Sequence, residues 1–416
     1  PGRQRLASFS VTKYGTQAAR DTDTFPDAGN GVRPDGTPVT GNAPTDASVA
    51  NTPALAQGYV RHLVNRWGAA ARGGLRYYIL DNEPSLWHDT HRDVRPAGLT
   101  LDELLTKTID YAAAIKAVDP GAQVVGPEEW GWLGFIYSGA DQQWGAKNGW
   151  GGRMPDRVSH GGRDALPWLL KQLRVEEAAS GRHLLDMVSV HYYPEGGADS
   201  ADVSPSAVRQ RYRSTRSLWD PDYVDESWIA QKIALIPRLR GWIETNYTPG
   251  TPIAITEYRW GPEQHISGAI AEADVLGIFG REGVAMAMRW PAPASGSMVA
   301  KAFQLYRNYD GRQSAFGDVS LGVTGHNPDD LAVFAAERTT DGALTVMLLN
   351  KAATSTAYAG TLAHASIEGT ASCWQLTSAG VIAHLPDMHV RSGVLADTLP
   401  AQSATLCVLP RAVMQP

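Results

Sequence analysis

Two glutamates in this chain each follow a short apolar segment, where they could supply acid–base and nucleophilic chemistry. Glu83 comes shortly after the apolar run at 75–80, within the sequence Asp-Asn-Glu-Pro, whose proline prevents a strand from continuing. Glu257 ends a second apolar run that begins at Ile253. Hydrolysis of a glycosidic bond needs two carboxyl groups, one to protonate the leaving oxygen and one to attack the sugar or to activate water. Each glutamate alone could be a buried structural group, but the pair favours a glycosidase.

Polar and aromatic side chains near these and other segment ends are candidate substrate contacts. The asparagine beside Glu83 could hydrogen-bond a sugar hydroxyl or the second glutamate, although it could also serve only the turn. A histidine and a tyrosine leave the apolar run at 187–191, and a lone histidine is often a structural group. Aromatic rings stack on the C–H faces of sugars, but they are also ordinary core residues. The predicted substrate-binding residues are Asn82, Trp87, Trp130, His191, Tyr193, Tyr258 and Trp290.

Short apolar segments alternate with longer amphipathic ones, which is the pattern of repeated βα units around a parallel sheet. Such units place chemistry at the carboxyl ends of the strands, where both glutamates are expected. Thr100 is a candidate helix cap, with Glu103 three residues later. A long polar loop at 18–50 is expected to overhang the cleft or to be partly disordered. The expected strands lie at 6–14, 75–80, 123–126, 187–191, 253–257 and 284–290, and the expected helices at 53–67, 99–118, 164–180 and 270–279.

The last part of the chain predicts a change of architecture. From near Asp329 the apolar residues alternate with a period of two, as at 343–350, without intervening helices, which indicates a β-sandwich. A chain of 416 residues also exceeds the usual size of a single core. The predicted fold class is therefore α/β, with a (β/α)8 TIM-type catalytic barrel at 1–325 and a β-sandwich domain at 326–416.

The chain has two cysteines, Cys373 and Cys407. They could form a disulfide across the C-terminal domain, but each also lies in an apolar run where a free buried thiol is common. No spacing typical of a metal site, such as Cys-x-x-Cys, occurs. The acidic clusters at 21–23 and 128–129 could hold a structural calcium ion, although a solvated surface is the favoured interpretation of both.

Composition narrows the possible partners. A net charge of −6 and a pI near 6.0, without clustered lysine and arginine, argue against a nucleic-acid partner. No stretch approaches the 18 or so apolar residues of a membrane span. Thirteen tryptophans and fifteen tyrosines suit a carbohydrate cleft. The sequence starts at Pro1 without a methionine or an apolar signal region, so we expect a processed, trimmed or fragmentary form.

The residues around Glu83 closely resemble the acid/base segment of glycoside hydrolase family 44, the endoglucanases and xyloglucanases. This segment reads Tyr-Ile-Leu-Asp-Asn-Glu-Pro-Ser-Leu-Trp from Tyr78, with Thr-His-Arg at 90–92. Further blocks that resemble the family's blocks, in the same order, lie at 186–194, 218–221, 227–231, 255–258, 265–268, 273–280 and 309–311. The resemblance extends from residue 55 to residue 416, and it implies that Glu83 is the acid/base and Glu257 the nucleophile.

The resemblance also implies how the barrel strands should be counted. If Glu83 and Glu257 close the fourth and seventh strands, as this clan of hydrolases requires, the six expected strands leave the first two unaccounted for. We therefore expect either a truncated or cut chain or a barrel that closes differently, because an open barrel would expose two strand edges.

The function that the resemblance implies is endo-acting, retaining hydrolysis of β-1,4-glucans, including cellulose-type glucans and xyloglucan, with xylan and mannan as further candidates. Retention predicts carboxyl groups about 5–5.5 Å apart, whereas about 6.5–9.5 Å would indicate inversion. The resemblance further implies a secreted monomer that acts on plant β-glucan polysaccharides and oligosaccharides and needs no cofactor. The alternative is a non-catalytic or truncated carbohydrate-binding protein on the same scaffold.

Overall fold

The computed structural model describes residues 49–409 and 413–414, apart from 92–93, 151, 362–364 and 367–368. The strand expected at 6–14 and nearly all of the loop expected at 18–50 lie outside these residues. The chain divides into two compact units. The first contains the residues up to Tyr192 and Leu239–Thr256, and the second contains Tyr193–Arg238 and the residues from Glu257 on. The predicted domain boundary at residue 325 stays a prediction.

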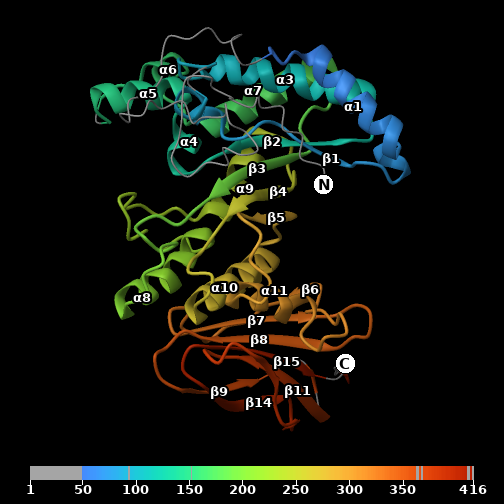
Figure 1. Ribbon diagram of the computed structural model, residues 1–416, viewed down its shortest axis with the longest axis vertical. Helices are drawn as coiled ribbons and strands as arrows, with labels where there is room; N and C mark the ends of the chain where they lie inside the picture. The colour runs from blue at the N-terminus through green and yellow to red at the C-terminus, as the bar shows by residue number, and fades with distance from the viewer. Residues whose placement is uncertain are drawn as a thin grey trace, which may run out of the picture. The chain divides into compact units, whose positions relative to one another are not determined.

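A five-stranded sheet has the strand order β1-β2-β3-β4-β5 (Figure 1). β2 pairs parallel with both β1 and β3, as expected for βα units. Glu83 follows β1, and Glu257 lies near the end of β4. All five strands expected between residues 75 and 290 are present, as β1 (Tyr77–Ile79), β2 (Gln123–Glu129), β3 (Met187–Tyr192), β4 (Ile253–Tyr258) and β5 (Met286–Arg289).

In the first unit, α1, α3 and α7 form a helical layer over β1, β2 and β3 (Figure 1). α1 (Pro53–Trp67) has the bounds expected from the sequence, because Thr52 caps it and Pro53 fits the first helical position. α3 (Leu101–Val118) starts at the predicted cap, where the Thr100 hydroxyl accepts a hydrogen bond from the N–H of Glu103. β2 is buried except at its first residue, and β3 is buried throughout.

The remaining helices connect and cover these strands. α7 (Ala165–Ser180) matches the helix expected at 164–180. α10 is longer than the helix expected at 270–279, because its cap is His265 and its stop is Gly283 in a left-handed conformation. The others are α2 (Trp87–Thr90), α4 (Trp132–Ile136), α5 (Gly139–Asn148), α6 (Pro155–Ser159), α8 (Pro205–Ser214), α9 (Leu235–Asn246), α10 (Ile266–Glu282), α11 (Met298–Arg307) and the 3-10 turns η2 (Ala70–Arg72), η3 (Pro84–Leu86) and η4 (Thr215–Leu218).

The C-terminal strands of the second unit form antiparallel sheets. The largest has the order β12-β11-β15-β8-β7-β6, with β13 also paired to β11, and β14 pairs with β9. The strands are β6 (Val319–Leu321), β7 (Leu331–Glu337), β8 (Leu344–Asn350), β9 (Thr356–Thr361), β10 (Ala365–Ser366), β11 (Gly369–Leu376), β12 (Ile382–His384), β13 (Met388–Val390), β14 (Val394–Leu399), β15 (Ser403–Leu409) and β16 (Val413–Met414).

Two features of this sandwich depend on packing. Leu395 and Leu399 of β14 lie in one core with Leu348 of β8, which holds the two layers together. β8 is buried at every position although its sequence alternates, because α10 covers the face that alternation alone would leave to water. Cys373 and Cys407 lie directly opposite each other on β11 and β15 and form a disulfide, which decides between the two possibilities that the sequence left open.

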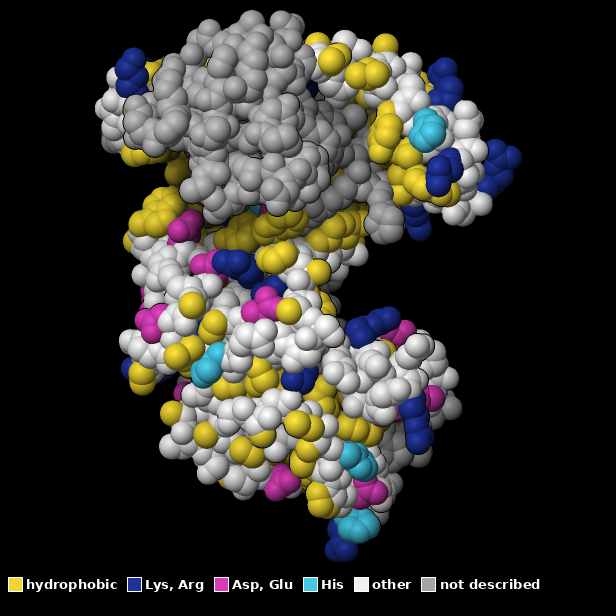
Figure 2. All heavy atoms as spheres, in the orientation of Figure 1, with side chains coloured by type: hydrophobic (Ala, Val, Ile, Leu, Met, Phe, Trp, Pro, Cys, Tyr) yellow, Lys and Arg dark blue, Asp and Glu magenta, His cyan; other side chains and the backbone are white. Residues whose placement is uncertain are grey.

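Within the ranges that the structure describes, no helix is long and apolar enough to span a membrane. Figure 2 shows acidic and basic side chains interspersed over the sandwich strands, on the face that is in view. Such mixing differs from the positively charged surface that binds the phosphate backbone of a nucleic acid.

Candidate active site

Glu83 has an unusual backbone conformation just beyond the end of β1. Its φ of 46° lies in the left-handed region, which costs a non-glycine residue free energy. Its N–H donates to the carbonyl of Glu128 at 3.0 Å. Its carboxyl oxygen Oε1 lies 2.9 Å from Nδ1 of His191, and its side chain is 20% exposed. The carboxyl group is thus oriented and still reachable from solvent.

His191 on β3 is fully buried and contacts two carboxyl groups at once. Its Nδ1 faces Glu83, and its Nε2 lies 3.1 Å from Oε2 of Glu128. A neutral imidazole has a single N–H donor, so either the ring carries a second proton or one of the two carboxyl groups does. Either way, a proton is shared among these three side chains in the interior of the first unit.

Glu129 is a second buried carboxyl group beside this cluster. It is 3% exposed, and its Oε2 accepts a hydrogen bond of 2.6 Å from the Ser85 hydroxyl. Burial raises the pKa of Glu129 to about 8, against the lowering effect of the Ser85 hydrogen bond, and the nearby charge of Glu83 adds to the rise. Glu129 is therefore protonated and neutral at neutral pH.

Replacing Glu129 by glutamine should make the protein more stable than the wild type, and increasingly so as the pH rises from about 5 to 8. The folded protein keeps the proton up to about pH 8, whereas the unfolded chain releases it near pH 4.5, so the wild-type free energy of unfolding falls with pH in this window. Glutamine has a similar shape, accepts the Ser85 hydrogen bond and never ionises. Between pH 5 and pH 8, the free energy of unfolding of the variant should rise relative to that of the wild type by on the order of a few kcal/mol. The measurement is thermal unfolding of both proteins at the two pH values. A difference that does not change with pH would contradict the assignment of a neutral Glu129.

The position of Glu128 and Glu129 corrects the sequence analysis, which favoured a solvated surface for both. Both are 3% exposed, because β2 continues to Glu129 instead of ending at Gly126 as expected. The signal that could have found them is their place directly after an apolar strand, which is also the place of Glu83. Ser85 was missed because nothing local shows its contact with Glu129.

In the second unit, Tyr193 and Glu257 form a direct contact. The Tyr193 hydroxyl donates to Oε2 of Glu257 at 2.9 Å. Glu257 is half-buried, as is Tyr193, which directly follows β3. A phenol that donates a hydrogen bond to a carboxylate limits the rotation of that carboxylate. This contact suits a carboxylate that must attack along one direction.

Two other predicted substrate contacts, at the ends of β4 and β5, differ in exposure. The Tyr258 side chain is buried, and its hydroxyl donates to Oε1 of Glu272 at 2.7 Å, so the structure does not bring it together with Tyr193. Successive residues of a strand point to opposite faces, which separates Tyr258 from Glu257. Trp290, just after β5, is 39% exposed and offers ring surface to solvent.

Glu272 was missed by the sequence analysis, since it lies inside α10 among small apolar residues. It is fully buried, and burial raises its pKa to about 7, against the lowering effects of Tyr258 and Arg289. Its Oε2 lies 3.3 Å from Nε of Arg289, at the end of β5. Glu272 therefore links the end of β4 to the end of β5. Its two partners, Tyr258 and Arg289, are the sequence neighbours of Glu257 and Trp290.

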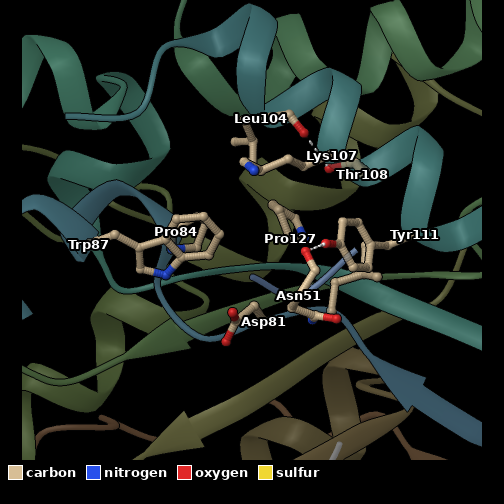
Figure 3. Close-up of a pocket in the computed structure, with 10 residues that line it drawn as sticks. Asn51, Asp81, Pro84, Trp87, Leu104, Lys107, Thr108, Tyr111 and Pro127 are labelled. Atoms are coloured by element: carbon tan, nitrogen blue, oxygen red, sulfur yellow. Dashed lines mark hydrogen bonds between the residues drawn. The ribbon is translucent and has the colours of Figure 1, made fainter. Parts of the chain in front are cut away.

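The remaining predicted contacts surround the β1 and β2 ends of the first unit. The Trp87 indole N–H donates to the carbonyl of Asn82 at 2.8 Å, which fixes the turn that carries Glu83. Trp87, Asp81 and Tyr111 line a pocket of about 180 Å³. Figure 3 shows Trp87 at the edge of this pocket. The Trp130 indole N–H donates to Gln142 at 3.1 Å instead. Asn82 is exposed.

Comparison with known proteins identifies the family. The model of the family described as glycoside hydrolase family 44 matches residues 2–196. A bifunctional glucanase-xylanase from a metagenome library is 55% identical, with a TM-score of 0.91, over 98% of this chain and 78% of its own. The chain belongs to glycoside hydrolase family 44. The resemblance seen in the sequence is thus confirmed.

Other members of family 44 extend the comparison. A Paenibacillus polymyxa xyloglucanase of this family is 32% identical, with a TM-score of 0.78, over 85% of this chain and 70% of its own. Solved family 44 structures combine a TIM-type barrel with a β-sandwich, which confirms the predicted fold class. Endoglucanase A of Paenibacillus lautus is 36% identical over 311 residues, which are 70% of this chain but 42% of that protein. The chain therefore spans less than half the length of this curated relative.

Proposed function

We propose that this protein is an endo-acting, retaining hydrolase of β-1,4-glucan backbones, with Glu83 as the acid/base and Glu257 as the nucleophile. The observation that carries the proposal is that one short segment holds both glutamates. His191 contacts Glu83, and Tyr193 contacts Glu257. Residues two apart in an extended chain are about 7 Å from each other and point to the same side. This tether supports a facing pair of carboxyl groups, for which we expect the separation of about 5–5.5 Å that retention requires.

The proposed reaction proceeds by two displacements. Glu83 donates its proton to the glycosidic oxygen while the Glu257 carboxylate attacks the anomeric carbon, which breaks the glycosidic bond and forms a glycosyl ester. Glu83, now ionised, takes a proton from water, and the water oxygen displaces Glu257 from the sugar. The Tyr193 hydroxyl orients the attacking carboxylate in the first step and stabilises it as the leaving group in the second.

The substrate class follows from the relatives. They are described as a glucanase-xylanase, a xyloglucanase, endoglucanases and a β-mannanase/endoglucanase. We propose cellulose-type glucans and xyloglucan as substrates, with xylan and mannan as further backbones, and stacking of a sugar ring on Trp290. The reaction uses two carboxyl groups and water, so no cofactor takes part in it. Because these polymers lie outside cells, we also propose that the protein is secreted. We propose a monomer on the family resemblance alone.

The experiment is hydrolysis of carboxymethylcellulose, xyloglucan, xylan and mannan, with viscosity and new reducing ends measured together. If cleavage is endo-acting, the viscosity should fall quickly while few new reducing ends have formed. Proton NMR of the first products should show the β-anomer before mutarotation, and an α-anomer would overturn retention. Binding of the polymers without any hydrolysis would instead favour the alternative of a carbohydrate-binding protein.

A further inference from the structure

We propose that Glu128 is a positioning residue that holds His191 against Glu83 and so keeps the Glu83 carboxyl group ready to protonate a leaving group. The inference rests on the proposed function, in which Glu83 is the acid/base. It assigns a task to a buried glutamate that takes no part in either displacement.

Glu128 is linked to Glu83 through both its main chain and its side chain. The Glu83 N–H donates to the Glu128 carbonyl at 3.0 Å. The Glu128 carboxyl group reaches the Glu83 carboxyl group through His191, with separations of 3.1 Å and 2.9 Å at the two ring nitrogens. Together these contacts close a ring of three residues, so a change in one side chain shifts the others.

The conformation and burial of Glu128 are costly. Like Glu83, it has a left-handed backbone, with a φ of 65°. It is 3% exposed, and its Oε1 is buried without a hydrogen bond among the described residues. A buried, half-satisfied carboxyl group and a strained backbone each oppose folding; an apolar side chain would avoid the first and a glycine the second. Their coincidence at one residue, beside the acid/base, indicates a function.

The chemistry of the imidazole explains what Glu128 does. Glu83 and Glu128 contact the two ring nitrogens of His191, and burial raises the pKa of the nearby Glu129 to about 8. When Glu128 accepts the Nε2–H, Nδ1 is the nitrogen that shares a proton with Glu83. That proton moves between Nδ1 of His191 and Oε1 of Glu83 without a change in the total charge of the three groups. If Glu128 became an amide, its NH2 group could donate to Nε2, and the Nδ1–H would then hold Glu83 in its ionised form.

Glu128→Gln should therefore slow the cleavage of substrates whose leaving group must be protonated. It should have little effect on substrates whose leaving group departs without a proton. The measurement is kcat/KM, which reports formation of the glycosyl ester, for aryl β-cello-oligosides whose phenol leaving groups range from weakly to strongly acidic. We expect a loss of about 10- to 100-fold with phenol and a loss of under about threefold with dinitrophenol. Equal losses for all leaving groups, or no loss, would overturn the proposal.

Glu129→Gln is the matched control, since it is the same change one residue later at the same 3% exposure, in a side chain that contacts Ser85 instead of His191. It should keep the wild-type dependence on the leaving group. Glu128→Asp keeps the charge and should recover part of the loss, and it carries the test if the glutamine variant does not fold. A wild-type protein that cleaves none of these glycosides and no glucan would refute the proposed function, whereas an active wild type with a uniform effect of Glu128→Gln refutes only this inference.

Discussion

Replacing Glu257 by glutamine should lower kcat/KM on soluble β-glucan by at least about 10⁴-fold, because an amide cannot attack the anomeric carbon. The amide oxygen still accepts the hydrogen bond of the Tyr193 hydroxyl, so the local structure should persist. Substrate affinity should therefore change little. The checks are release of reducing sugar for activity and calorimetry with a cello-oligosaccharide for binding.

The matched control for this variant is Glu244→Gln, in an exposed glutamate of α9 whose Oε1 accepts a backbone hydrogen bond that glutamine can also accept. It should keep wild-type activity. If Glu257→Gln is as active as this control, Glu257 is not the nucleophile.

Replacing Glu83 by alanine should lower activity on polymeric glucan by about 10²- to 10⁴-fold, which is the usual contribution of a general acid/base. The loss should be much smaller for formation of the glycosyl ester from a dinitrophenyl glycoside, because that leaving group needs no proton. The ester should then accumulate, since no base remains to activate water. The measurement is a burst of phenol in a stopped-flow experiment, followed by a slow steady state.

Added azide separates the two glutamates. In Glu83→Ala, azide needs no base, attacks the glycosyl ester and should restore turnover with a β-glycosyl azide as product. In Glu257→Gly, azide can fill the space of the nucleophile and should give the α-glycosyl azide from an activated β-glycoside. The opposite pattern of anomers would make Glu83 the nucleophile and Glu257 the acid/base.

Much of the fold follows from local signals. α1 has the expected bounds, and α3 starts at the expected Thr100 cap, because a cap hydroxyl and a proline act within one helical turn. The strands from β1 to β5 follow from short apolar runs, which are typical of the strands of a parallel sheet. The ends of such strands can also be predicted, because polar residues follow the apolar run. Glu83 and Glu257 were identified in this way.

The contacts of the site depend on elements far apart in the sequence. His191 meets Glu83 across 108 positions and Glu128 across 63, and no local pattern specifies either pairing. The Cys373–Cys407 disulfide likewise requires the register in which β11 and β15 pair. Register follows from the packing of whole sheets, so both cysteine states remained open before the structure.

The amino-acid sequence was thus sufficient for the candidate carboxyl pair, the alternation of strands and helices, and the family, because these depend on residue types and short spacings. The tertiary structure alone revealed that Glu128 and Glu129 are buried, that burial raises the pKa of Glu129, and that the Tyr258 hydroxyl contacts Glu272. Burial and side-chain partners are set by what packs against a residue from the rest of the chain, and the pKa of a carboxyl group follows from both.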